Sequence, residues 1–174
     1  KFYKLFLRII FMEKQKTLVL LKPDCVMRQF VGEIITRFEK AGYKIIAMKM
    51  VWYDNDFFEK HYHDVEERHS RKILEMNLKA MTTGPIIAMV IEGINAIESV
   101  RKMVGPTEPK KAAPGTIRGD YSHYTYKLAD KKEIAVRNLI HASADKKDAK
   151  YEIELWFDKK ELHSYKTVHD AFVM

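Results

Sequence analysis

A histidine set among small residues is the feature of this chain that could most directly do chemistry. His141 lies in residues 138–143 (NLIHAS), where a short apolar run leads into it and small side chains leave room beside it. Glu152 follows on the next expected helix, and a carboxylate there can hold one ring nitrogen so that the other is free to act as a base or nucleophile. A histidine after apolar residues is more often an ordinary core or surface residue, so this pattern alone does not decide its role.

Three basic side chains and one hydroxyl could bind phosphate in a chain that has no familiar phosphate-binding loop. Neither GxxxxGK[ST] nor GxGxxG occurs, so a phosphate site would have to be built from side chains. Arginine forks match phosphate oxygens in pairs, and lysine adds a compact charge. The candidates are Lys22, Arg101, Thr107 and Arg118. Two alternatives stay open, because Arg118 could be ion-paired within its loop and Lys22 could be a solvated strand end.

The histidines and the single cysteine do not predict a metal site in the protein itself. His61 and His63 stand two residues apart in an expected helix, where side chains at that spacing do not face each other. Cys25 is the only cysteine, which excludes an internal disulfide and a cysteine zinc cluster and fits a reducing compartment. We therefore expect no metal-ligating residues and a cytoplasmic protein.

The length allows one domain, two at most, and the charge suits an anionic ligand. The net charge of +7 suits a polyanionic ligand such as a nucleotide, whereas nucleic-acid binding usually shows a concentrated basic patch. No apolar run approaches the roughly 18 residues of a membrane span. We expect residues 1–12 to form an extension outside the fold and residues 13–174 to form the domain. A membrane-contacting amphipathic tail is the alternative for the extension.

The apolar pattern predicts four strands with helices between them. The expected strands are residues 17–21, 43–52, 86–91 and 139–140, and the expected helices are residues 31–38, two short helices within 56–81, 97–104, and one through Ala149, Ile153 and Trp156. Asp56 is expected to begin a helix, Asp145 to cap another, and Gly93 to end a strand; residues 105–126 are expected to form a long loop. This order predicts an α+β fold, a ferredoxin-like α/β sandwich whose mostly antiparallel four-stranded sheet carries helices on one face.

Seven segments carry a resemblance that no one of them would establish alone. They are residues 17–24 (TLVLLKPD), 31–38 (VGEIITRF), 61–62 (HY), 84–93 (GPIIAMVIEG), 114–120 (PGTIRGD), 138–143 (NLIHAS) and 152–157 (EIELWF). In this order and spacing, the chain resembles the nucleoside diphosphate kinase family over nearly everything from about residue 12 onward.

The resemblance implies a phosphotransferase that moves the γ-phosphoryl group of a nucleoside triphosphate, typically ATP, to nucleoside diphosphates. It implies a ping-pong reaction through a phosphohistidine, with Mg²⁺ held mainly by the nucleotide phosphates and not by protein ligands. His141 matches the nucleophile, Glu152 the carboxylate that holds its other nitrogen, and Ser143 a supporting hydroxyl.

The same resemblance implies a nucleotide clamp. Arg101, Thr107 and Arg118 match residues that hold the outer phosphates. Lys22 and Asn138 match residues that reach the ribose hydroxyls and nearby phosphate oxygens, and Tyr62 matches a residue close to the histidine.

The chain departs from the family pattern on the nucleobase side. The family stacks the base on a phenylalanine, whereas a gapped alignment places Ile73 at that position and an ungapped one places Ser70 there. Stacking on an aromatic ring contributes about 1–3 kcal/mol per base, so its loss predicts weaker nucleotide binding. Residues 121–137 are longer than the usual pattern and do not identify what covers the other face of the base. Ala144 stands where many members carry an acidic residue.

Two other functions are compatible with the sequence. A catalytically silent relative could serve as a nucleic-acid or protein interaction module, although the retained His141, Glu152, Arg118 and Lys22 argue against it. A histidine phosphorelay protein would share the phosphohistidine without needing a nucleotide clamp. The resemblance also implies a homo-oligomer, a hexamer or a tetramer, with no membrane partner and no nucleic acid.

Overall fold

The computed structural model describes residues 14–173, and the expected extension over residues 1–12 lies outside them. The strands are β1 (Lys14–Leu21), β2 (Lys44–Val51), β3 (Ile86–Ile94) and β4 (Ile140–Ala142). The α-helices are α2 (Pro23–Met27), α3 (Val31–Lys40), α4 (Asn55–His61), α5 (Val65–Arg68), α6 (Arg71–Met81), α7 (Ala96–Val104), α8 (Ile117–Tyr121), α9 (Tyr126–Lys132), α10 (Lys146–Trp156) and α11 (Asp170–Val173), with short 3₁₀ turns η1 (Pro109–Lys111) and η2 (Lys159–Glu161). None of the helices in this part of the chain has the length and apolar character to cross a bilayer.

The sheet confirms the predicted α+β class. Its order is β2-β3-β1-β4, and every neighbouring pair is antiparallel. β1 is therefore central, and it pairs with β4 so that Leu20 stands opposite His141. The short β4 is thus held in place by a central strand whose residues 17–21 are all buried.

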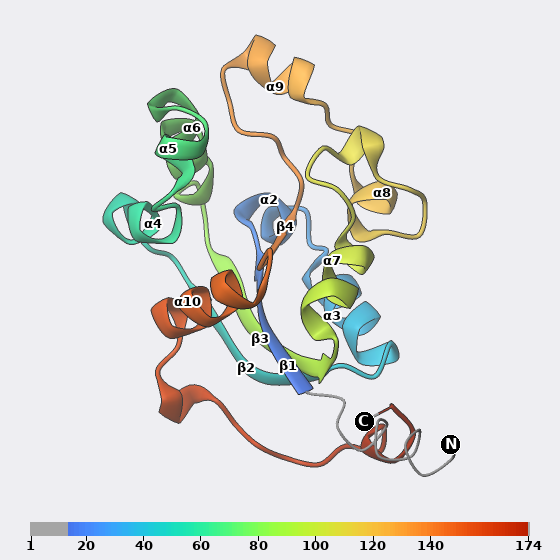
Figure 1. Cartoon of the computed structure of the whole chain (residues 1–174). Helices are drawn as coiled ribbons and strands as arrows, with labels where there is room; N and C mark the ends of the chain where they lie inside the picture. The colour runs from blue at the N-terminus through green and yellow to red at the C-terminus, as the bar shows by residue number, and fades with distance from the viewer. Residues whose placement is uncertain (1–13, 174) are drawn as a thin grey trace, which may run out of the picture.

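Helices cover both faces of the sheet, so the expectation of helices on one face is wrong (Figure 1). Leu18 and Leu20 face a core that includes Phe58 of α4, residues of α6 and Trp156 of α10. The alternate residues of β1, Val19 and Leu21, face a second core built from α3, α7 and α8. A strand buried on both faces has a continuous apolar sequence, which is the pattern of residues 18–21.

Several local expectations are corrected. Asp54, and not Asp56, caps α4, because its side chain accepts a hydrogen bond from the backbone N–H of Phe57. Three helices, not two, span residues 55–81, since Ser70 caps a separate α6. β3 also continues through Gly93 to Ile94.

Gly93 is required by a close contact and does not end the strand. A Cβ atom at this position would lie 2.6 Å from Cδ1 of Tyr43, so the ring of Tyr43 occupies the space that a side chain would need. The supposed long loop after α7 is likewise shaped by η1 and α8, which fold it against the second core.

Candidate active site

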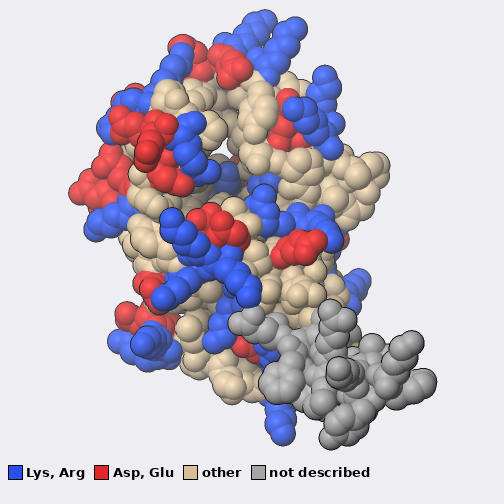
Figure 2. Space-filling view, viewed as in Figure 1, with Lys and Arg blue, Asp and Glu red and all other residues tan. Residues whose placement is uncertain are grey.

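A cavity of about 220 Å³ brings together most of the residues that the sequence predicted for the site. It lies between the α4–α6 helices and the segments that carry α7, α8 and β4, and Figure 2 shows a hollow on this face with basic side chains in and around it. The predicted residues that line it are Lys22, Tyr62, Arg101, Thr107, Arg118, Asn138, His141 and Glu152. Ser143 lies behind Glu152, buried against β1.

A tight turn before β4 aims His141. The backbone N–H of Ile140 donates to the carbonyl of Asn138 at 2.8 Å, which closes a γ-turn centred on Leu139 at φ 68°. A positive φ is strained for any residue other than glycine. It is held by the carboxylate of Asp24, which accepts from the backbone N–H of Leu139, and by the backbone N–H of Lys22, which donates to the carbonyl of Leu139. The turn places Asn138 and His141 at the same cavity.

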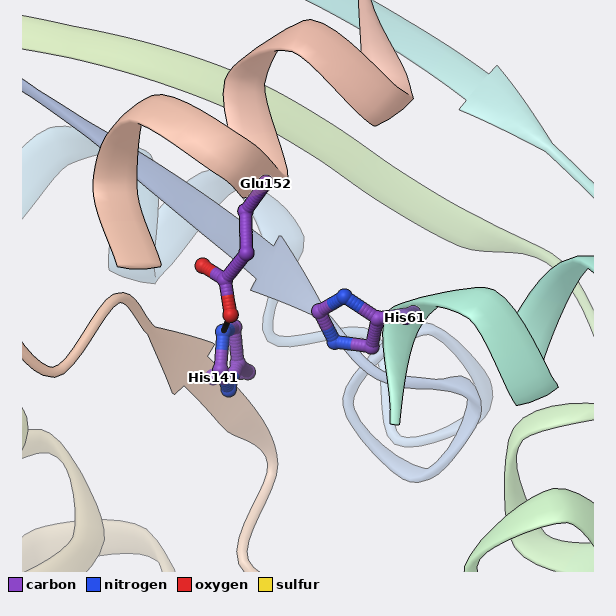
Figure 3. Close-up of side chains that lie close together, drawn as sticks. All are labelled: His61, His141 and Glu152. Atoms are coloured by element: carbon purple, nitrogen blue, oxygen red, sulfur yellow. Dashed lines mark hydrogen bonds and ion pairs between the residues drawn. The ribbon is translucent and has the colours of Figure 1, made fainter. Parts of the chain in front are cut away.

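Glu152 holds one nitrogen of the His141 ring. Nε2 of His141 lies 2.9 Å from Oε1 of Glu152, while the hydroxyl of Ser143 donates to Oε2 at 2.6 Å (Figure 3). Burial opposes ionisation of Glu152, but the charge and hydrogen bond of His141, with smaller effects from His61 and Ser143, bring its pKa below the usual range. The carboxylate is therefore ionised, so His141 donates from Nε2 and its Nδ1 is the nitrogen left with a lone pair.

Glu152 lies on the buried face of helix α10. Asp145 caps the helix by accepting from the backbone N–H of Asp148, as the sequence predicted. Ala149, Glu152 and Trp156 then share the buried face. A carboxylate inside such a stripe costs free energy unless it is hydrogen bonded, and here His141 and Ser143 provide those bonds.

Lys22 and Asn138 form a polar pair at the end of β1. Nζ of Lys22 donates to Oδ1 of Asn138 at 2.9 Å, and the amide nitrogen of Asn138 donates to the carbonyl of Thr107. Burial lowers the pKa of Lys22 to about 8, with Arg118 adding to this shift and Asp24 opposing it. Among residues 14–173 no carboxylate forms an ion pair with Lys22, so an anion in the cavity would stabilise the charged lysine.

Arg118 combines a structural role with a place in the cavity. Its guanidinium donates to the carbonyls of Asn138, Gly105 and Ile140, and so ties the loop after α7 to β4. Burial, reinforced by the nearby charge of Arg101, lowers its pKa to about 10. Arg101 is exposed, and its guanidinium donates to the carbonyl of Ala142. The cavity therefore holds one buried arginine bonded to three backbone carbonyls and one exposed arginine.

The cavity mouth fits a hydrated magnesium ion better than a protein-bound metal. Asp64 and Asp148 line the cavity, and burial together with the carboxylates of Asp145, Glu152 and Asp64 raises the pKa of Asp148. Arg68, which pairs with Asp64 at 2.9 Å, opposes this shift in part. A cation would relieve this repulsion, and Mg²⁺ keeps several waters and prefers oxygen. Within residues 14–173, the one group close enough to share a metal is His61, His141 and Glu152. Two imidazoles and one carboxylate are not a magnesium ligand set.

Ile73, like Ser143, is a predicted site residue that does not line this cavity. It is partly buried and packs against the core of Phe58 and Trp156. Asn77, one turn later on α6, and Val136 line both this cavity and a neighbouring one of about 200 Å³. This side of the cavity is thus formed by α6 and the segment before β4.

Sequence reasoning did not assign roles to three residues that support the site. Asp24 holds the γ-turn, and His61 packs against His141 with its ring fixed by Trp156. All three stand inside segments that carried the resemblance, which was the available signal. Their contacts join positions far apart in the chain, so spacing alone could not reveal them.

A ferredoxin-like sandwich that carries a carboxylate-held histidine beside a cluster of basic side chains defines a phosphotransferase of nucleotides. The family model for nucleoside diphosphate kinase matches residues 15–162. The chain belongs to the nucleoside diphosphate kinase family.

Relatives and solved structures of this family match the chain over nearly its whole length. A nucleoside diphosphate kinase of Pyrococcus furiosus is 47% identical over 160 residues, 92% of this chain and 93% of the relative. One from Borreliella burgdorferi is 44% identical over 154 residues, 87% of this chain and 92% of the relative. A solved structure of the Borrelia burgdorferi enzyme, a transition-state mimic with bound vanadate and ADP, has a TM-score of 0.90 at 41% identity and covers 92% of this chain and 96% of its own. The Halobacterium salinarum enzyme in complex with CDP has a TM-score of 0.79 at 34% identity, covering 93% and 99%.

Proposed function

We propose that His141 is the residue that carries the phosphoryl group in this nucleoside diphosphate kinase. The observation that carries the proposal is the contact of its Nε2 with Glu152, which leaves Nδ1 as the nucleophilic nitrogen at the cavity. Figure 3 shows the second ring nitrogen of His141 on the side away from Glu152. An imidazole held in one tautomer and one orientation is prepared for attack.

The reaction then proceeds in two matched half-reactions. Nδ1 of His141 attacks the γ-phosphorus, an N–P bond forms, and the bond from that phosphorus to the leaving diphosphate oxygen breaks. The ring keeps its Nε2–H and becomes formally positive, and the adjacent carboxylate of Glu152 stabilises this charge. A nucleoside diphosphate next enters the same cavity, and its terminal oxygen takes the phosphoryl group in the reverse of the first step.

The basic side chains bind the phosphates in this proposal. Arg101, Thr107 and Arg118 face the outer phosphates, while Lys22 and Asn138 lie where ribose hydroxyls and phosphate oxygens would reach. A relative with this fold was solved with bound vanadate and ADP, which supports nucleotide binding by this fold. Bound with the nucleotide, Mg²⁺ would neutralise charge on the phosphates, and Asp64 and Asp148 would be the carboxylates near enough to accept from its waters.

One labelling experiment tests the assignment. With γ-labelled ATP and Mg²⁺, we expect an acid-labile label on His141 that leaves as GTP when GDP is added. His141→Asn should take no label, whereas the matched change at the exposed His123 should label normally. Folded protein that takes no label would support the silent interaction module, and label that GDP cannot remove would support a phosphorelay protein.

We further propose that the enzyme is a homo-oligomer, a hexamer or a tetramer, in the cytoplasm. β2 is an edge strand of the sheet, and Met48, Met50 and Trp52 at this edge are each more than half exposed. An uncovered apolar edge strand favours pairing with another chain. Sedimentation should give a mass several times that of one chain, and Met48→Lys with Met50→Lys should lower it; a monomeric wild-type protein would contradict the proposal.

A further inference from the structure

His61 lies against the ring of the proposed nucleophile although the reaction does not use it. It is the last residue of α4, and only 5% of its surface is exposed. The centroids of the His61 and His141 rings are 4.9 Å apart, and the ring planes are nearly perpendicular at 83°. Figure 3 shows the edge of the His61 ring opposite its attachment to α4 turned toward His141. His61 therefore meets one face of the nucleophile with a ring edge.

Trp156 fixes which nitrogen of His61 carries the proton. The indole Nε1–H lies 3.3 Å from Nδ1 of His61, and an indole nitrogen can only donate. Nδ1 must accept this bond, so a neutral His61 carries its proton on Nε2. Burial, reinforced by the charge of His141, lowers the pKa of His61 to about 3, which keeps the ring neutral at ordinary pH.

This tautomer argues against a metal ion at the cluster of His61, His141 and Glu152. Nε2 of His61 has no hydrogen-bond partner within the described residues, and as an N–H it has no lone pair to offer a metal. Directed toward an aromatic ring, an N–H group makes a weak favourable contact with the ring face. The cluster is thus better suited to packing against the nucleophile than to binding a cation.

We propose that His61 is a positioning residue for phosphoryl transfer, a neutral ring anchored by Trp156 whose edge sets the rotation of the His141 imidazole. The inference rests on the proposed role of His141. Glu152 holds Nε2 through a single contact, around which the ring can still turn. The edge of His61 blocks that rotation on one face, so Nδ1 stays aimed at the site of the γ-phosphorus. Small errors of aim are costly, since about 1 Å of misplacement can lower a rate about 100-fold.

Two substitutions separate positioning from stability. His61→Asn keeps an oxygen acceptor for Trp156 but removes the ring edge. His61→Phe keeps a ring edge and loses the acceptor, leaving the buried indole N–H without a partner. We expect His61→Asn to be the more stable variant and yet to phosphorylate His141 at least about tenfold more slowly than wild type in a single turnover. His61→Phe should be less stable and closer to the wild-type rate, and ADP affinity should change less than about twofold in both.

A second readout does not depend on activity with ATP. In ¹⁵N spectra, the His141 ring of the wild type should give one sharp Nε2–H tautomer, and His61→Asn should broaden or split it. Wild-type protein that takes no label from ATP would refute the proposed function while leaving this spectral comparison intact. A His61→Asn protein with the wild-type single-turnover rate and an unchanged His141 spectrum would overturn the positioning role. This test holds even if the His61→Phe protein does not fold.

Discussion

Nε2 of His141 and Oε1 of Glu152 lie 2.9 Å apart and join β4 to α10. The strand supplies a ring whose position is set by pairing with β1, and the helix supplies a buried carboxylate set by its cap at Asp145. Neither residue is oriented by its own element alone. In the proposed mechanism this contact makes Nδ1 the attacking nitrogen, and a single substitution at Glu152 removes it.

Glu152→Gln is expected to slow phosphorylation of His141 by about 10- to 100-fold, because the charge that stabilises the phosphorylated ring is lost and the tautomer is no longer fixed. Rapid-quench measurement of the labelled protein gives the rate. Glu154→Gln, on the exposed side of the same helix, is the matched control and should behave as wild type. Equal rates for both variants would exclude an electrostatic role for Glu152.

The lowered pKa of Lys22, about 8, predicts pH-dependent nucleotide binding. Below that pH the side chain is charged and attracts phosphate, and above it the charge is lost, so affinity must fall as pH rises. We expect ADP to bind up to about tenfold more weakly at about pH 9 than at about pH 7. Calorimetric titration measures this slope. Lys22→Met should bind weakly with a flat profile, and a wild-type profile that is also flat would contradict the assignment.

Arg118 and Arg101 offer a matched pair that separates structure from binding. Arg118→Ala removes bonds to three backbone carbonyls, so we expect a loss of at least about 2 kcal/mol of unfolding free energy. In a chain of this size this lowers the melting temperature by about 4–8 °C. Arg101→Ala should change stability by less than about 0.5 kcal/mol and still weaken ADP binding. Equal melting temperatures for the two variants would contradict a structural role for Arg118.

Local sequence patterns predicted strands and helix caps correctly where burial or capping alone determined the local structure. The continuous apolar residues 18–21 predicted a buried strand, and Asp145 predicted a helix cap, which its hydrogen bond confirms. The same apolar run also implied that both faces of the sheet are covered, which the expectation of helices on one face overlooked. The prediction that Gly93 ends a strand was wrong, because the ring of Tyr43 requires a glycine there. In the sequence alone, such a glycine cannot be distinguished from one that ends a strand.

The supporting contacts of the site could not be predicted in the same way. Asp24 reaches the backbone of Leu139, and Trp156 reaches His61, across separations that carry no periodic signal. The γ-turn at Leu139 is equally hidden, because leucine has no preference for positive φ and adopts it only when tertiary bonds compensate the strain. Family resemblance located the segments, but only the assembled fold shows which atoms they bring together.

We expect Asn77, and not Ile73, to contact the nucleobase. Ile73 packs against the core, whereas Asn77 lies one turn further along α6 and lines the cavity beside Val136. Asn77→Ala should weaken ADP binding a fewfold, up to about tenfold, through loss of a hydrogen-bonding group, and leave pyrophosphate binding unchanged because pyrophosphate has no base. Ile73→Phe is the matched control and should leave ADP affinity unchanged. Competition titrations with ADP and pyrophosphate measure both. Tighter ADP binding by Ile73→Phe would instead place the base on that residue, as the family alignment predicted.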